Sequence, residues 1–147
     1  MGKKSRDKGN SFERAVAAAV RAAWGLDVSR TPLSGGWGKR KTGGDLVFMD
    51  DNVNLFVECK NPRSVNLETI LLGEDCPIFS WWDKALGQAA SERKTNTVLV
   101  FKWWRSRTWV LTRSSSCGVT FHRNDEKLLL LPLEDWLACG KESYVKV

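Results

Sequence analysis

The sequence predicts a mixed α/β fold in which helices flank a central β-sheet. Apolar residues recur at helical spacing in three segments, at the start, in the middle and near the end of the chain. Between and after these segments lie short runs rich in β-branched and aromatic residues, which are typical of strands. The order is helix, strands, helix, strands, helix, without an internal repeat. A length of 147 residues fits a single domain spanning residues 1–147.

The first helix is predicted to begin at Asn10 or Ser11, either of which can cap it, and to run to about Trp24. The glycine that follows ends it as a C′ residue. The preceding MGKKSRDKGN is polar and basic, so residues 1–9 are expected to form a flexible N-terminal arm. After a short strand over 26–31, the glycine-rich segment PLSGGWGKRKTGG predicts a mobile loop.

The next two strands, 45–50 and 54–60, are predicted to pair as a β-hairpin through a tight turn at the Asp-Asp dipeptide that follows the first. The strongly apolar segment 95–104 is expected to be central in the sheet. The remaining elements follow from the same patterns: a short helical turn over 67–73, a helix over 80–94, strands over 107–112, 117–122 and 127–132, and a closing helix over 132–140.

The positive charge is concentrated at one end of the chain. The formal net charge is +6, from 23 Lys and Arg against 17 Asp and Glu. Residues 1–41 hold 10 basic and 3 acidic side chains, a net of +7, so the remainder is near neutral at −1. This asymmetry favours a polyanionic partner, nucleic acid first and an anionic membrane surface second, with a solubilising tail as the alternative.

Histidine and cysteine usage excludes several kinds of site. A single histidine, His122, rules out a His-rich zinc site and a two-histidine nuclease motif within one chain. The four cysteines form no CxxC pair, so a structural zinc is not expected. There is no apolar run of about 20 residues and no apolar segment after the basic start. We therefore expect a cytoplasmic protein, prokaryotic or phage-encoded, without a membrane partner and with reduced thiols.

The segment LFVECK predicts a charged pair on one face of a strand. Its period of two places Glu58 and Lys60 on one face, and Val57 and Cys59 on the other. Asp45, after Gly-Gly, is expected to reach the same end of the hairpin. Two converging carboxylates suit a hard cation such as Mg²⁺, and the lysine can orient the attacking water or neutralise phosphoryl charge. An ordinary Glu-Lys pair on an exposed strand is the alternative.

These acidic residues occur in an order that resembles the PD-(D/E)xK nuclease superfamily. Glu13 lies in the first helix, Asp45 after a glycine-rich loop, Glu58-Cys59-Lys60 on the next strand and Gln88 in the second helix. The segments KGNSFERAVAAAV and SGG look most like archaeal-type and phage Holliday junction resolvases. The resemblance spans about residues 8–100 and implies a restriction-endonuclease-like core, Mg²⁺-dependent hydrolysis of DNA with Mn²⁺ as a substitute, and branched DNA as substrate.

The resemblance also implies a role for each of these residues. Asp45 and Glu58 would be metal ligands together with the Cys59 carbonyl, and Lys60 would be the catalytic lysine. Glu13 would contact the metal through water or position the site.

Two further positions follow from the same resemblance. Ser34 would lie near the scissile phosphate, and Gln88 would orient the lysine or a phosphate. One position departs from the family pattern, because Gly44 stands where the superfamily has proline before the aspartate.

Two basic clusters and one tryptophan are candidate DNA contacts. For Arg30 the alternative interpretation is a charge at a strand edge that has no role in binding. No helix shows a spacing of side chains suited to reading bases, so we expect the protein to recognise the shape of DNA rather than its sequence. Trp37, among cations, is expected to stack on a base or wedge into a junction. The expected phosphate contacts are Lys3, Lys4, Arg6, Lys8, Arg30, Lys39, Arg40 and Lys41.

Seven of the eight tryptophans fall within predicted elements, where packing is the expected role: Trp24, Trp81, Trp82, Trp103, Trp104, Trp109 and Trp136. The adjacent pairs 81–82 and 103–104 leave one member exposed unless another chain covers it, which favours a homodimer. Two copies would also suit symmetric cutting of a four-way junction. The alternatives to a resolvase are another nuclease of this superfamily, of nicking, repair or restriction type, and a non-catalytic nucleic-acid-binding module.

Overall fold

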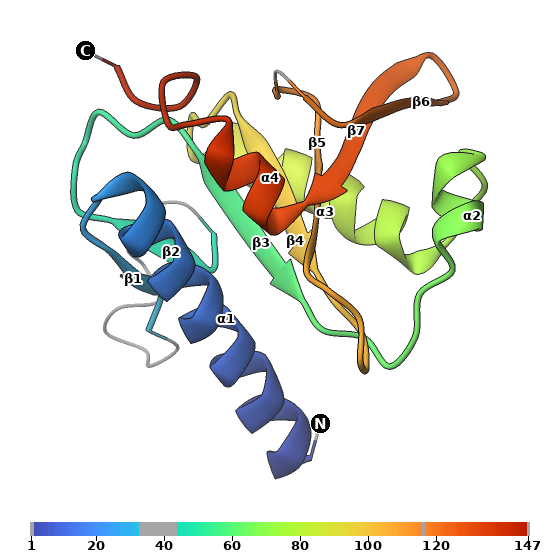
Figure 1. Ribbon diagram of the computed structural model, residues 1–147, viewed down its shortest axis with the longest axis horizontal. Coiled ribbons are helices and arrows are strands. Elements are labelled where there is room, and N and C mark those ends of the chain that lie inside the picture. The colour runs from blue at the N-terminus through green and yellow to red at the C-terminus, as the bar shows by residue number, and fades with distance from the viewer. Residues whose placement is uncertain (1, 33–43, 116, 147) are drawn as a thin grey trace.

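The computed structural model describes residues 2–32, 44–115 and 117–146 of the chain. Within these ranges the chain forms the predicted mixture of helices and strands (Figure 1). The elements are α1 (Lys3–Trp24), β1 (Val28–Arg30), β2 (Leu46–Phe48), β3 (Phe56–Lys60), α2 (Leu67–Leu71), α3 (Pro77–Ser91), β4 (Thr97–Phe101), β5 (Trp109–Thr112), β6 (Val119–Arg123), β7 (Glu126–Pro132) and α4 (Leu133–Ala138).

Five strands form a mixed sheet in the order β3-β4-β5-β7-β6, and β1 and β2 form a small antiparallel sheet of their own. Only the β3–β4 pair of the larger sheet is parallel, with Glu58 opposite Leu99 and Lys60 opposite Phe101. Because β3 and β4 run in the same direction, their carboxyl ends lie side by side at one end of the sheet. This arrangement confirms the predicted α/β class and matches a restriction-endonuclease-like core.

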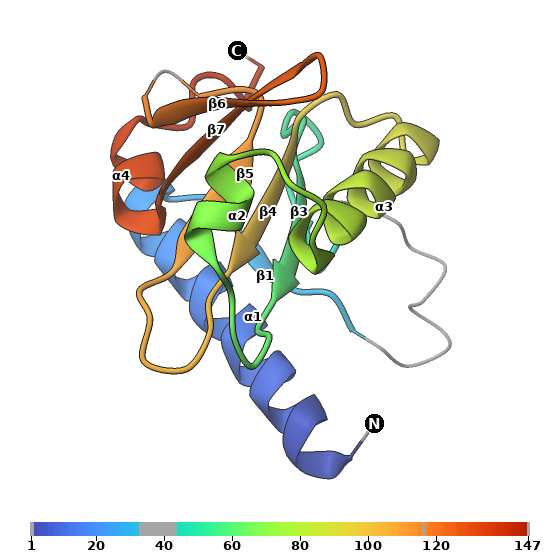
Figure 2. The same cartoon turned by 90° about the vertical axis from the view of Figure 1, so that its right-hand side faces the viewer.

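Helices cover both faces of the sheet (Figures 1 and 2). Val98 and Val100 of β4 belong to the core that α1, α4 and the small sheet share, whereas Leu99 and Phe101 pack with α2 and α3. All five residues of β4 are buried. Burial on both faces explains why this strand is continuously apolar, and β4 is an internal strand, as predicted.

The first helix begins earlier than the sequence predicts. α1 starts at Lys3, so the expectation of a flexible arm over residues 1–9 is wrong. Asn10 was the expected cap, but its Oδ1 accepts a hydrogen bond from Arg30 at 2.6 Å, and the helix continues past it in both directions. Long charged side chains favour helix in the residues before it. Gly25 ends the helix in the left-handed region at φ 67°, as predicted.

The predicted hairpin is also wrong. β2 pairs antiparallel with β1, where Val28 lies opposite Phe48, and β3 pairs with β4 instead. Consecutive strands separated by a turn signal usually pair, but β3 buries apolar side chains on both faces and needs a fully buried neighbour. Residues 50–55 therefore form a wider connection, fixed by a bridge between Val53 and Val145.

The other elements confirm the prediction with shifted ends. The second long helix begins at Pro77 instead of residue 80, because proline suits the first turn of a helix. Strands β5, β6 and β7, the short α2 and the closing α4 lie where the patterns predicted them. Among the described residues, no helix is both long and apolar enough to cross a bilayer.

The tryptophans divide between core and surface. Trp24, Trp82 and Trp136 are buried, and the Trp24 and Trp136 rings lie 4.8 Å apart between α1 and α4. In each adjacent pair one ring is more exposed than its neighbour. Trp81 is half-buried beside buried Trp82, and Trp104 is 72% exposed. The predicted exposure is thus confirmed for Trp104, while the homodimer stays a prediction.

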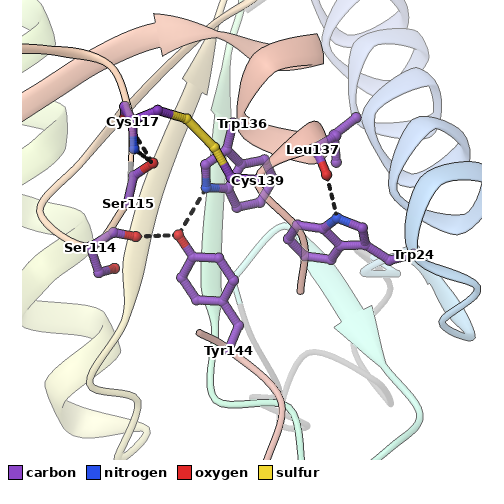
Figure 3. Close-up of a disulfide and its surroundings, with 8 residues drawn as sticks. All are labelled: Trp24, Ser114, Ser115, Cys117, Trp136, Leu137, Cys139 and Tyr144. Carbon is purple, nitrogen blue, oxygen red and sulfur yellow. Dashed lines mark hydrogen bonds between the residues drawn. A yellow bond between two sulfur atoms is a disulfide. The ribbon is translucent and has the colours of Figure 1, made fainter. Parts of the chain in front are cut away.

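Two of the four cysteines are joined, which corrects the expectation of reduced thiols. Cys117, before β6, forms a disulfide with Cys139 at the end of α4, while Cys59 and Cys76 are free. Figure 3 shows this bond beside a cluster in which Trp136 Nε1 donates to the Tyr144 hydroxyl at 2.9 Å and that hydroxyl donates to the Ser114 carbonyl. The spacing of 22 residues could not reveal the pairing, because the sheet brings these loops together.

Candidate active site

Three elements bring the predicted acidic residues together beside β3. Glu13 projects from α1, Asp45 precedes β2, and Glu58 and Lys60 lie on β3. As the period-two pattern predicted, Val57 and Cys59 face the α1 side of the sheet, whereas Phe56 on the opposite face packs against α3. Electrostatic interactions link all four charged side chains.

Asp45 is fixed by three hydrogen bonds. Its backbone N–H donates to the Val57 carbonyl at 2.8 Å, and its own carbonyl accepts from the Thr31 N–H at 2.8 Å. Its side-chain Oδ2 accepts from the Cys59 N–H at 2.7 Å. The carboxylate is thereby held against the free edge of β3, on the side away from β4. Because the N–H and C=O of one strand residue point to the same side, the Cys59 carbonyl also faces Asp45.

Gly44 explains the departure from the superfamily pattern. Its φ is +82°, in the left-handed region, and a Cβ at this position would collide with the Val57 carbonyl oxygen and press on the Phe56 ring. Proline fixes φ near −65° and could not adopt this backbone. Glycine at this position lets the chain lie close enough to β3 for Asp45 to bond it.

The pKa of the Glu58 carboxyl is raised above its ordinary value. Burial has the largest effect, followed by a side-chain hydrogen bond with Asp45 and the Asp45 charge, and these outweigh the lowering effect of Lys60. In the metal-free protein the Glu58 carboxyl therefore keeps its proton to a higher pH than a free glutamate does, and it is hydrogen-bonded to Asp45. Such a pair binds a proton or a cation in preference to carrying two bare negative charges.

Glu13 has a basic partner that sequence reasoning did not identify. Burial and the Asp45 charge raise the pKa of Glu13 to about 7, and Arg30 opposes this rise. Arg30 Nε lies 3.6 Å from Glu13 Oε1, and the two side chains are only 17% and 13% exposed. Arg30 therefore orients Glu13, with Asn10 as its second partner. The alternation of the 26–31 strand was the one sequence feature that placed Arg30 on a defined face.

Lys60 contacts an aromatic ring on α3. Its Nζ lies 5.4 Å from the centroid of the Trp81 ring, a cation–π distance. The ring confines the ammonium group on the same face as Glu58. This contact gives half-buried Trp81 a role beyond packing, which its helical spacing alone did not reveal.

The donor set fits a hard divalent cation. Burial and mutual repulsion raise the pKa of both Glu13 and Glu58, and a cation would relieve that repulsion. Over residues 2–32, 44–115 and 117–146, no three His, Cys, Asp or Glu side chains are already grouped as ligands of one ion. Mg²⁺ needs no such group, since one or two carboxylates suffice with water and phosphate oxygens. Asp45 and Glu58, with the Cys59 carbonyl, are the groups that fit.

The other predicted site residues fall into three sets. Gln88 lies on an exposed part of α3, and in the part of the chain that the structure describes no contact joins its side chain to the carboxylates. Lys3, Lys4, Arg6 and Lys8 are exposed along the N-terminal half of α1. The predictions for Ser34, Trp37, Lys39, Arg40 and Lys41 lie outside the described residues.

A groove with two lysines among its lining residues lies beside the carboxyl end of β3. It has a volume of about 330 Å³ and lies between the middle of α1, from Lys8 to Val16, and the residues that follow β3 and β4. Lys8, Asn61, Lys102 and Thr108 are among its lining residues. The Lys102 N–H donates to the Lys60 carbonyl at 3.2 Å, so the groove begins at the residue next to the candidate catalytic lysine.

The sheet, its helices and the carboxylates beside β3 define a restriction-endonuclease-like protein of the PD-(D/E)xK kind. The model of one protein family, described as phage putative PDDEXK endonuclease, matches residues 4–130, and the chain belongs to this family. The match covers β5, β6 and part of β7, which the resemblance in the sequence did not reach. No curated protein and no solved structure gives a significant match. The family indicates a nuclease.

Proposed function

We propose that this protein is a Mg²⁺-dependent endonuclease that hydrolyses phosphodiester bonds in branched DNA, with the four-way junction as its preferred substrate. The observation that carries the proposal is the convergence of Asp45, Glu58, Glu13 and Lys60 at one edge of the sheet. Mn²⁺ would substitute for Mg²⁺, since both accept oxygen ligands.

The residues divide the chemistry among them. Asp45 and Glu58 would hold the ion, which supplies an activated water and neutralises charge on the phosphoryl oxygens. Lys60, held by Trp81, would stabilise the negative charge that develops as the new P–O bond forms and the leaving sugar oxygen departs. Glu13 would accept a proton or order a water, because its pKa of about 7 suits proton exchange near neutral pH.

The basic half of α1 supports a nucleic-acid substrate. With a rise of about 1.5 Å per residue, Lys8 lies about 7.5 Å along the helix from Glu13 and Lys3 about 15 Å. Figure 1 shows this half of α1 projecting beyond the sheet. A rigid cationic helix can bind phosphates without reading bases, which favours recognition of shape over sequence. The preference for a four-way junction and the action of two copies rest on the resemblance to resolvases.

Strand-scission assays test the proposal directly. The wild type is compared with Asp45→Asn, Glu58→Gln and Lys60→Ala on four-way junctions, linear duplex, nicked duplex and flaps. Each substitution is expected to lower cleavage by at least about 100-fold, since each removes charge stabilisation from the transition state. Asp125→Asn is the matched control, because Asp125 is exposed in the β6–β7 turn at the opposite edge of the sheet.

The results separate the alternatives. Cutting of linear duplex as fast as junctions would contradict a resolvase and favour another nuclease of this superfamily. Cleavage that survives all three substitutions would refute the assigned site. Binding with a steep salt dependence, but without cleavage in Mg²⁺ or Mn²⁺, would leave a nucleic-acid-binding module.

A further inference from the structure

The connection between β4 and β5, residues 102–108, lies at the end of the sheet where β3 finishes with Lys60. Because β3 and β4 are parallel, the chain leaves both strands at this same end, and the Lys102 N–H donates to the Lys60 carbonyl at 3.2 Å. Figures 1 and 2 both show this connection at the same end of the molecule as the N-terminal half of α1 and the segment after β3. We call residues 102–108 the β4–β5 loop.

This loop presents a tryptophan ring to solvent. Trp104 is 72% exposed, the largest exposure among the large hydrophobic side chains of the described residues. Its neighbour Trp103 instead packs on Phe101, with ring centroids 6.4 Å apart. Exposing so large an apolar ring costs solvation free energy, and the core contacts of Trp103 do not require it.

The conformation of the loop fixes this exposure. The Trp103 N–H donates to Ser106 Oγ at 2.9 Å, and the Ser106 N–H donates to the Trp103 carbonyl at 3.0 Å, which closes a turn. Arg105, inside the turn, has a φ of 64°, in the left-handed region that non-glycine residues rarely adopt. The backbone is thus held in a form that directs Trp104 and Arg105 away from the core.

The surroundings of the ring are cationic. The Arg105 guanidinium carbon lies 4.5 Å from the centroid of the Trp104 ring, and Lys102 and Arg107 flank the turn. Arg107 has only a long contact of 3.8 Å with Glu134, and both side chains are about 60% exposed, so this pair is weak. A flat apolar ring among cations matches a ligand with a flat aromatic face and negative charge, which is the chemistry of a nucleotide.

We propose that the β4–β5 loop binds an unpaired nucleotide of the DNA substrate, whose base stacks on the Trp104 ring while Lys102, Arg105 and Arg107 contact the adjoining phosphates. A base inside a duplex has both faces covered by its neighbours, whereas an unpaired base is free to turn out and stack on this ring. The Cα atom of Trp104 lies within about 7 Å of that of Lys102 by chain length alone. The bound nucleotide would therefore lie beyond the end of β3 that carries Lys60.

This inference rests on the proposed function only in taking DNA as the ligand. It gives the basis for preferring branched DNA, because junctions, flaps and overhangs offer unpaired or frayed bases that linear duplex lacks. It also assigns a role to a segment that lies beyond the residues over which the sequence resembles resolvases.

Binding without cleavage tests the inference. In the presence of a chelator, fluorescence anisotropy gives the affinity of the full chain for a labelled duplex with a single-stranded overhang and for the same duplex with blunt ends. Trp104→Ala is expected to weaken binding to the overhang DNA by about five- to 100-fold. Its affinity for blunt duplex should stay within about twofold of the wild type, since the cations remain.

The fluorescence of a base analogue gives a second measurement, and a general loss of affinity would not change it at saturation. 2-Aminopurine in the overhang is expected to lose fluorescence on binding the wild type, because stacking on an indole ring quenches it, and to keep it when bound at saturation by Trp104→Ala. Trp104→Phe should retain part of the quenching. Val119→Ala is the matched control, since Val119 is 60% exposed on β6 at the far edge of the sheet.

Three results would overturn the inference. They are an equal loss of affinity for blunt and overhang DNA, equal quenching by the wild type and Trp104→Ala, and an equal effect of Val119→Ala. Since no bond is cut, a protein that shows the predicted stacking but never cleaves would refute the nuclease proposal alone. A protein that cleaves through Asp45 and Glu58 but shows no stacking would refute this inference alone.

Discussion

The buried carboxyl of Glu58 makes the stability of the metal-free protein depend on pH. Burial and the neighbouring Asp45 raise the pKa of Glu58 well above its ordinary value of 4.5. In the unfolded chain the carboxyl ionises near that ordinary value, whereas in the folded protein it keeps its proton to higher pH. This group therefore costs no stability below about pH 4.5, and stability is lost as pH rises from there through the folded pKa.

Glu58→Gln should remove this dependence while keeping the size of the side chain. Each pH unit between the two pKa values costs about 1.4 kcal/mol of unfolding free energy, so the cost at pH 7 is about 3 kcal/mol relative to pH 4.5. The variant is expected to be more stable than the wild type by about this amount at pH 7, and equally stable near pH 4.5. Mg²⁺ should stabilise the wild type more than the variant, because an ion that binds only the native state adds to stability and the variant lacks the Glu58 carboxylate as a ligand.

Urea unfolding measures the difference directly. The eight tryptophans, of which Trp24, Trp82 and Trp136 are buried, provide the fluorescence signal. Titrations at several pH values in a chelator give the free energy of unfolding of both proteins. Glu134→Gln is the control, since this exposed carboxyl should change the profile little. Parallel profiles for the wild type and Glu58→Gln between about pH 5 and pH 8 would refute the reasoning.

Two further predictions concern the backbone and the disulfide. Gly44→Ala should lower the free energy of unfolding by about 1–3 kcal/mol, as measured in urea, and should abolish cleavage because it moves the adjoining aspartate. The control is Gly87→Ala, in open space on α3, which should instead stabilise the protein by about 0.5–1 kcal/mol. A Gly44→Ala protein as stable and active as the wild type would contradict this. Replacing Cys117 and Cys139 with alanine should cost about 3 kcal/mol in non-reducing buffer, because the bond closes a loop of 22 residues. A reductant should destabilise the wild type alone, and an equal shift in both proteins would show that the thiols are not joined.

Local patterns predicted most of the elements and the faces of the key strand. The apolar run of β4 and the alternation of β3 depend only on which side chains must be buried, so they could be inferred residue by residue. The partners of the strands could not. Pairing of β3 with β4, in place of a hairpin, is decided by burial of β3 on both faces, which is a property of the assembled sheet.

The same contrast holds at the candidate site. The sequence identified Glu13, Asp45, Glu58 and Lys60 by their order, but it gave no reason for Gly44. The positive φ and the close approach to β3 supply that reason. The partners that hold the charged groups, Arg30 for Glu13 and Trp81 for Lys60, come from elements far apart in the chain, and no spacing rule relates them.

By itself the sequence determined the α/β class, the order of its elements and the asymmetry of charge, because these depend on composition and short-range periodicity. The candidate acidic residues came instead from the resemblance to the PD-(D/E)xK superfamily. The tertiary structure decided the strand pairing, the disulfide, the raised pKa of Glu58 and the exposure of Trp104. The physical reason is that burial, pKa and side-chain contacts depend on which segments of the chain pack against one another. Only the folded chain fixes that.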